Sequence, residues 1–197
     1  MTARIDISKK TIDDKRLFTV EEYYKMGEAG IFDGERVELI NGIIYYMSPI
    51  GSPHRGCVAH LYEELLLQFR GKFTIAAQDP IRCSDNSEPE PDIAVLDFRK
   101  DRYKTEHPTP ENVHLLIEVA DTTLERDRTL KKTFYAQEGI LEYWIANIQD
   151  QQIEIFRDPK NDDYQEKIIV KKGESATCKT IDFTLSVDDL FLSLIHI

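Results

Sequence analysis

The chain has 197 residues, of which 41% are hydrophobic and 31% charged, and this length and composition allow a single globular domain with a substantial core. The formal net charge of −11 argues against non-specific nucleic-acid binding, which needs a basic surface. No run of about eighteen apolar residues is present, so we expect no membrane partner, and three widely spaced cysteines indicate neither a disulfide framework nor a thiolate zinc site. A reducing cytoplasm is the expected location.

The start of the chain predicts an arm followed by a helix. Residues 1–17 are polar and mixed in charge and lack the apolar core of a signal peptide, so we expect a flexible N-terminal arm there and a single domain over residues 18–197. The domain opens with Thr19 as the N-cap of a helix. Glu22, three residues later, completes a capping box, and Gly30 is placed to end the helix.

A hairpin and a long helix are expected next. Two apolar runs at 36–40 and 43–47 flank Asn41-Gly42, and Asn-Gly between such runs is the strongest short-range hairpin signal. From 52 to 70 the apolar residues recur at helical spacing, which predicts an amphipathic helix.

The rest of the chain alternates between predicted strands and helices. Strands are expected at 73–83, 93–97, 113–120, 141–145, 152–157, 166–170 and 178–183. A helix is expected at 127–138 and a short final helix from Val187, while the charged, proline-containing segment 98–111 reads as a surface loop. The sequence therefore predicts one α/β domain built on a central mixed β-sheet flanked by helices.

Two acidic residues stand at unusual places in this pattern. Asp92 opens a strand directly after a Pro-Glu-Pro stretch, whose prolines keep the backbone extended. Glu118 lies inside the apolar run 113–120, which is typical of a central strand covered on both faces. An ionised carboxylate in such a strand is costly without a cation or a good hydrogen-bond partner. Two acids at the ends of neighbouring inner strands therefore suggest a divalent metal site.

The order of these residues matches the active-site pattern of metal-dependent nucleases, with one departure. In that pattern a lysine stands two places after the second acid, and here the position holds Ala120. Lys131, in the next predicted helix, is a substitute. It lies four residues after Asp127, the favourable orientation for a helical ion pair, and it borders the apolar face of its helix. Its ammonium group is thus placed to reach back toward the strand ends.

Several ordered motifs resemble one family. They are Glu38-Leu39-Ile40-Asn41-Gly42-Ile43-Ile44-Tyr45, Met47-Ser48-Pro49, His54, Glu88-Pro89-Glu90-Pro91-Asp92-Ile93, Ile117-Glu118-Val119, Asp127-Arg128 with Lys131, Tyr135 and Gly139, and Glu142-Tyr143-Trp144. Together they resemble the Uma2 family, bacterial proteins described as restriction endonucleases and long classed as a domain of unknown function, within the PD-(D/E)xK nuclease superfamily. The resemblance covers residues 18–157 and continues loosely to the C-terminus. It implies a restriction-endonuclease-like fold.

The resemblance also implies roles for particular residues. Asp92 and Glu118 would be direct metal ligands, with the Val119 carbonyl completing the inner sphere, and Glu38 would lie near the metal on the hairpin. Lys131 would replace the lysine that is missing at position 120. His54, Gln78 and Asp127 are candidates to line the cleft. The expected chemistry is hydrolysis of phosphodiester bonds in nucleic acid, with DNA as the expected substrate and Mg²⁺ or Mn²⁺ as the cofactor, because oxygen ligands favour these ions over zinc.

Other interpretations remain open at this point. Asp92 can simply begin a strand after proline, and Glu118 can pair with a buried arginine. A non-catalytic module that keeps the nuclease fold to bind protein or nucleic acid is favoured by Ala120 and by the net charge of −11. A glycosidase built on Glu118 and Asp92 would need an aromatic sugar-binding cleft, for which no ordered motif is present. A homodimer is the expected assembly, because two-fold dimers are the commonest oligomers.

Overall fold

The computed structural model describes residues 11–12 and 15–192. Of the predicted N-terminal arm, residues 1–10 and 13–14 lie outside the described residues. Within it, the short strands β1 (Thr11–Ile12) and β2 (Lys15–Arg16) pair antiparallel. In the described part of the chain, no helix has the length and apolar character needed to cross a membrane.

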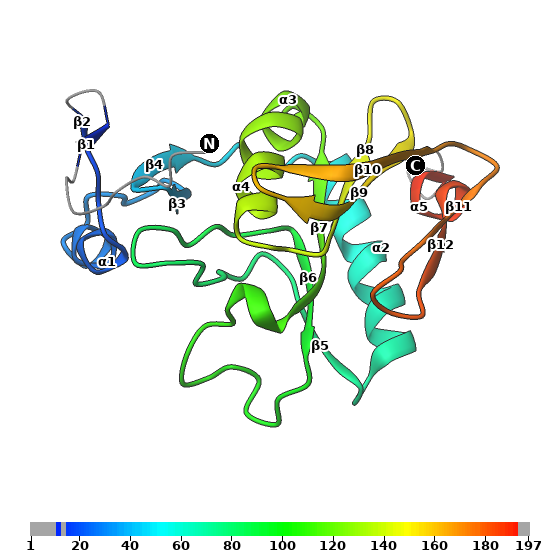
Figure 1. Ribbon diagram of the computed structural model, residues 1–197, viewed down its shortest axis with the longest axis horizontal. Coiled ribbons are helices and arrows are strands. Elements are labelled where there is room, and N and C mark those ends of the chain that lie inside the picture. The colour runs from blue at the N-terminus through cyan, green and yellow to red at the C-terminus, as the bar shows by residue number, and fades with distance from the viewer. Residues whose placement is uncertain (1–10, 13–14, 193–197) are drawn as a thin grey trace.

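A six-stranded mixed sheet forms the centre of the molecule (Figure 1). Its strands, in spatial order, are β10 (Asp163–Val170), β9 (Gln152–Lys160), β8 (Glu142–Asn147), β7 (Val113–Ala120), β6 (Ile93–Asp97) and β5 (Phe73–Ala76). Neighbours pair antiparallel except β7 and β8, which are parallel. A parallel pair needs a crossover connection, and the helical segment between β7 and β8 supplies it. The predicted fold class is confirmed.

Helices cover the two faces of this sheet (Figure 1). On one face, α2 (Ser52–Phe69) packs Cys57, Leu61, Leu65 and Phe69 against the odd-numbered side chains of β7, such as Ile117. On the other face lies a continuous helical segment made of α3 (Leu124–Arg126), a π-helical turn η3 (Asp127–Lys131) and α4 (Lys132–Gln137). It covers the even-numbered side chains of β7. Because side chains alternate along a strand, Glu118 belongs to this second layer.

The predicted hairpin is present as β3 (Val37–Ile40) and β4 (Ile43–Tyr46), next to α1 (Val20–Glu28). Asn41 and Gly42 both have positive φ, 51° and 75°, as the two-residue turn of a hairpin requires. The Gly42 N–H donates to the Asn86 carbonyl at 2.7 Å, and a Cβ at Gly42 would lie 2.7 Å from that of Leu17. The hairpin tip is therefore held against the loop that leads into β6.

Several predicted boundaries differ from the structure by three residues or more. Strand β9 runs to Lys160 and not to 157, and β10 begins at Asp163 and not at 166. Strand β5 ends at Ala76 and not at 83, because the chain turns at Gln78, whose φ is +56°. The predicted strand 178–183 is instead the turn between β11 (Ser175–Thr177) and β12 (Thr184–Ser186), closed by the Cys178 N–H donating to the Phe183 carbonyl at 2.8 Å. The predicted helix 127–138 begins three residues earlier, at Leu124.

The two remaining short helices agree with the sequence in different ways. The segment 98–111 is a loop as predicted, with one 3-10 turn, η2 (Pro110–Asn112), entering its last two residues. The final helix is α5 (Val187–Leu192), confirmed from its predicted start.

A buried charge cluster anchors the C-terminal hairpin to the sheet. Glu142 on β8 is fully buried and accepts hydrogen bonds from Trp144 Nε1, from Arg157 Nε and from the backbone N–H of Lys179, each at 2.8 Å. Arg157 also donates to the Thr177 carbonyl at the end of β11. One carboxylate therefore joins β8, β9 and the segment that follows β11.

A second buried carboxylate holds the helical segment onto the sheet. Glu154 on β9 accepts hydrogen bonds from the guanidinium of Arg128, in η3, and from Asn147, and it pairs with Lys167 at 3.2 Å. Burial alone would raise the pKa of Glu154, but these donors outweigh it and hold the pKa at about 2.

This lowered pKa predicts a pH-dependent contribution to stability. A carboxyl group whose folded pKa lies below its unfolded value stabilises the fold above the unfolded pKa, and that stabilisation is lost as the pH falls toward 2. We expect the difference in unfolding free energy between the wild type and Glu154→Gln to shrink by about 1–2 kcal/mol from pH 6 to pH 3, measured by urea unfolding. Because all other carboxylates titrate in both proteins, a difference that stays constant with pH would contradict this.

Candidate active site

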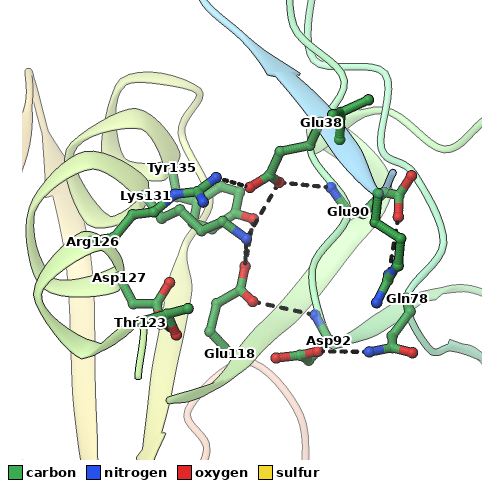
Figure 2. A network of polar contacts seen from close by, with 12 residues as sticks. Glu38, Gln78, Glu90, Asp92, Glu118, Thr123, Arg126, Asp127, Lys131 and Tyr135 are labelled. Carbon is green, nitrogen blue, oxygen red and sulfur yellow. Dashed lines mark hydrogen bonds and ion pairs between the residues drawn. The ribbon is translucent and has the colours of Figure 1, made fainter. Parts of the chain in front are cut away.

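The two acids converge on one layer of the sheet, at the open ends of β6 and β7 (Figure 2). The register pairs Ile93 with Ile117, which places Asp92 opposite Glu118. The Asp92 N–H points at Glu118 Oε2, 3.4 Å away, and Asp92 Oδ2 accepts a hydrogen bond from the Val119 N–H at 2.9 Å. Both carboxylates are buried, with 8% and 3% of Asp92 and Glu118 exposed.

Two cleft-lining candidates contact Asp92 directly. His54 Nε2, from the first turn of α2, lies 3.0 Å from Asp92 Oδ2, and Gln78 Nε2 donates to Asp92 Oδ1 at 3.1 Å. The left-handed backbone of Gln78 lets its own N–H reach the carbonyl oxygens of Pro91 and Asp92, both at 3.1 Å. Burial raises the pKa of Asp92, but His54, the Val119 N–H and Lys131 outweigh burial and leave the pKa below its ordinary value.

Lys131 contacts the second acid. Its Nζ lies 2.9 Å from Glu118 Oε1, which also accepts a hydrogen bond from the Tyr135 hydroxyl at 2.9 Å. The pKa of Glu118 is raised to about 8, chiefly by burial and also by Asp92 and other nearby acids, although Lys131 opposes them. Burial also lowers the pKa of Lys131, but the surrounding carboxylates outweigh it and keep the ammonium protonated. The site therefore holds more negative charge than its one buried lysine balances.

The π-helical turn places Lys131 where a regular helix would not. The i→i+5 spacing in η3 widens the helix by one residue, a feature frequent at functional sites. The ion pair predicted between Asp127 and Lys131 is replaced by pairs from Lys131 to Glu118 and, at 3.4 Å, to Glu38. Asp127 is also buried, and it accepts a hydrogen bond from the Thr123 hydroxyl at 2.6 Å.

Glu38 reaches the same cluster from the hairpin. Figure 2 shows the Lys131 ammonium between the carboxylates of Glu38 and Glu118. Glu38 also accepts hydrogen bonds from the Arg126 guanidinium and from the Glu90 N–H, the latter at 3.2 Å. The structure thus brings together every residue singled out from the sequence: Glu38, His54, Gln78, Asp92, Glu118, the Val119 backbone, Asp127 and Lys131.

The site also contains four residues that were not expected from the sequence: Arg36, Glu90, Arg126 and Tyr135. A signal existed for two of them. Tyr135 lies four residues after Lys131, on the same helix face, and Glu90 lies two residues before Asp92, on the same side of an extended chain. Arg126 stood among charged residues whose default interpretation is solvated surface, and Arg36 was placed only as the first residue of the hairpin run 36–40.

The acids, Lys131, His54, Gln78 and the two arginines line a pocket with a volume of about 240 Å³. Its walls come from the loop after β4, residues 47–51, and from the segment after β7, residues 121–123. Six carboxylates line it, together with three permanently charged cations, Arg36, Arg126 and Lys131. A divalent cation bound here would balance the excess of carboxylates. It would also lower the raised pKa of Glu118, because a nearby positive charge favours the ionised carboxylate.

The acids can be compared with the usual ligands of a divalent ion. Within the described residues, no three histidine, cysteine or acidic side chains form a complete metal cage. Mg²⁺ typically takes only one or two carboxylates and completes its shell with water and substrate phosphate. The pair Asp92 and Glu118, beside the Val119 backbone, supplies that number of carboxylates.

Comparisons with known proteins place this geometry in context. The model of the Uma2 family, described as "Putative restriction endonuclease", matches residues 20–188. The solved structure of a "putative nuclease belonging to DUF820" from Anabaena variabilis ATCC 29413 superposes with a TM-score of 0.67. It shares 16% sequence identity, over 90% of this chain and 99% of that one, and so it supports the fold alone. Among curated proteins, none matches the chain.

Proposed function

This chain belongs to the Uma2 family of restriction-endonuclease-like proteins, and on that premise we propose that it is a metal-dependent nuclease that hydrolyses phosphodiester bonds in nucleic acid. The observation that carries the proposal is the convergence of Asp92, Glu118 and Lys131 from three separate segments at one pocket. In metal-assisted hydrolysis, two acids can hold the metal ion and a nearby cation can offset negative charge, and the three side chains are placed for these roles.

The two acids and one carbonyl would hold the metal. Asp92, Glu118 and the Val119 carbonyl are the proposed ligands, and Mg²⁺ or Mn²⁺ is the proposed ion. When bound, such an ion polarises the scissile phosphate and lowers the pKa of a coordinated water. His54 and Gln78 hold the Asp92 carboxylate in place through its two oxygens. These contacts orient a ligand before any metal arrives, as the outer contacts of metal ligands commonly do.

Lys131 is the proposed cationic residue of the reaction. Its ammonium is buried, protonated and fixed between Glu38 and Glu118, so it can orient the attacking water or offset the charge that develops on the phosphate. Tyr135 donates to the same Glu118 oxygen as Lys131. The carboxylate is thereby held in a single orientation.

Removing the Lys131 charge is expected to slow cleavage while metal binding persists. Lys131→Met keeps the apolar stem, and we expect kcat to fall about 10²–10³-fold because one preorganised cation is lost. The measurement is cleavage of labelled oligonucleotides in Mn²⁺, with Mg²⁺ titration calorimetry on the same variant. Lys132→Met, which removes a half-buried ion pair to Asp163 outside the pocket, is the matched control.

A second variant tests whether Lys131 replaces the missing lysine. Ala120 shares the strand face of Glu118, so Lys131→Met combined with Ala120→Lys returns a cation to the usual position. We expect at least about a tenfold recovery of kcat over Lys131→Met alone, with folding checked by circular dichroism. Equal activity of wild type and Lys131→Met would show that Lys131 takes no part in the reaction.

The alternative function is a non-catalytic module that keeps this fold to bind protein or nucleic acid. Ala120 in the usual lysine position and the net charge of −11 favour it. Calorimetric titration with Mg²⁺ and Mn²⁺ separates the two functions. Metal uptake that is lost in Glu118→Gln supports the nuclease, and no uptake by the wild type supports the module.

A further inference from the structure

We infer that the substrate enters the pocket as a single nucleic-acid strand, and that Arg126 and Arg36 hold its phosphate at the pocket mouth. This inference rests on the proposed function for its chemistry, but it makes a separate claim about which form of nucleic acid fits. Three features of the structure carry it: the depth of the acids, the small number of cations and the position of the two arginines.

The reacting acids are buried among the pocket residues, where a single strand reaches them more easily than the backbone of an intact duplex does. Asp92 and Glu118 are only 8% and 3% exposed, at the floor of a pocket walled by residues 47–51 and 121–123. In a duplex, each phosphate is held beside its neighbours on a wide, stiff cylinder. A strand that is free of its complement can bend a phosphate into such a pocket, as enzymes that act on single strands or on extruded nucleotides require.

The cations at the pocket are too few for a duplex footprint. Arg36, Arg126 and Lys131 are the permanent cations that line it, against six carboxylates. A protein that makes about six to ten phosphate contacts with a duplex shows a correspondingly steep salt dependence, whereas three pocket cations can make only a few. The basic cluster at 99–104 lies beyond the far end of β6, because Asp92 opens that strand and Asp97 closes it. It therefore does not extend the pocket.

The two arginines are placed to hold a phosphate. Arg126 is fixed by its donations to Glu38 and to the Tyr46 carbonyl, and its guanidinium lies 5.1 Å from the centre of the Tyr45 ring. Its Nε is buried and closed to an incoming anion, so the donors that remain are the second N–H groups of Nη1 and Nη2. Arg36 makes only a long contact of 3.4 Å to Glu90.

Both guanidinium groups keep donors for an incoming anion. An arginine carries five N–H donors in a planar fork that matches phosphate geometry. The side chains of Arg126 and Arg36 are 24% and 40% exposed, whereas the side chain of Lys131 is 6% exposed and pairs with Glu118 and Glu38. The loop after β4 also lines the pocket with Met47, Pro49 and the exposed Ile50, which offer apolar surface for a base.

Binding measurements test this inference independently of cleavage. The Asp92→Asn variant with Mg²⁺ is titrated against a fluorescein-labelled strand of about 16 nucleotides, and against the same strand in a blunt duplex, by anisotropy. We expect the single strand to bind at least about tenfold tighter, with a slope of log K against log salt no steeper than about −2, because at most three cations take part. DNA and RNA versions of the strand distinguish the two sugars.

Variants of the arginines locate the contact. Arg126→Ala and Arg36→Ala, each made in the same background, are expected to weaken binding of the single strand about five- to tenfold, and Arg126→Lys to recover part of the loss. Lys100→Ala, which removes one cation from the distant cluster, should change it less than about twofold.

The outcomes separate this inference from the proposed function. A duplex that binds as tightly as the single strand, no binding of either, or arginine variants that bind like the Lys100 control would each overturn the inference. Wild-type protein that cleaves nothing in Mn²⁺, while the preference for single strands persists, would refute the nuclease and leave the inference standing. Equal cleavage of duplex and single strand would support the nuclease and overturn the inference that the substrate is a single strand.

Discussion

Replacing Asp92 by asparagine is expected to abolish phosphodiester cleavage, with a loss of about 10³-fold or more in kcat. The asparagine side chain would keep the shape of the aspartate and an acceptor for the Val119 N–H, but it would carry no charge. A neutral ligand holds Mg²⁺ poorly, and the charge stabilisation that the ion supplies would be lost with it. The measurement is cleavage of single-stranded and duplex oligonucleotides in Mg²⁺ and in Mn²⁺.

Asp97→Asn is the matched control for this substitution. Asp97 closes the same strand that Asp92 opens, but it is exposed and its carboxylate pairs with His114 at 2.8 Å, away from the pocket. We expect this variant to cleave like the wild type, within about twofold. If the wild type and Asp92→Asn cleave every substrate at the same rate, the proposed nuclease centre is wrong, whatever the metal.

Replacing Glu142 by alanine is expected to destabilise the fold by about 3–5 kcal/mol. Arg157 is only 6% exposed and would lose the carboxylate that neutralises it. Trp144 Nε1 and the Lys179 N–H would lose their acceptor as well, and an unsatisfied buried donor costs about 1–3 kcal/mol. The measurement is the midpoint and slope of urea unfolding at pH 7.

The control for Glu142 uses the same arginine. Glu166 lies 3.6 Å from Arg157 and 2.8 Å from Lys179, but its side chain is 36% exposed. Glu166→Ala is expected to cost at most about 1 kcal/mol, because exposed ion pairs are screened by water. Since the Glu142 cluster lies outside the pocket, the cleavage rate of folded Glu142→Ala should stay near that of the wild type. A loss below about 1 kcal/mol for Glu142→Ala would show that the cluster does not anchor the C-terminal hairpin.

Local pattern was enough to predict most of the secondary structure. The capping box of Thr19 and Glu22, the Asn41-Gly42 turn and the apolar run of β7 all lie where their residue types predict them. The errors occurred where a local pattern suits two structures. Residues 178–183 alternate like a strand, but the hydrogen bond from Cys178 to Phe183 closes them into a turn.

The acids of the candidate site could also be predicted from local sequence pattern. A carboxylate in a continuous apolar strand, or directly after a Pro-Glu-Pro stretch, is unusual enough to indicate a site without any coordinates. The place of Arg126 and Arg36 in the site could not be predicted from the sequence. An arginine near other charged residues is normally assigned to the solvated surface, and only the tertiary structure shows which residues surround it.

The sequence by itself determined most of the strands and helices and the acids of this protein, because periodicity, caps and turn residues act within a few positions of one another. Only the tertiary structure decided which side chains meet. Glu38, Asp92, Glu118 and Lys131 lie on four separate segments, and the pairing of β6 with β7, the docking of the hairpin and the π-helical turn bring them together. The raised pKa of Glu118 follows from that convergence, since burial and neighbouring charge exist only once the chain has folded.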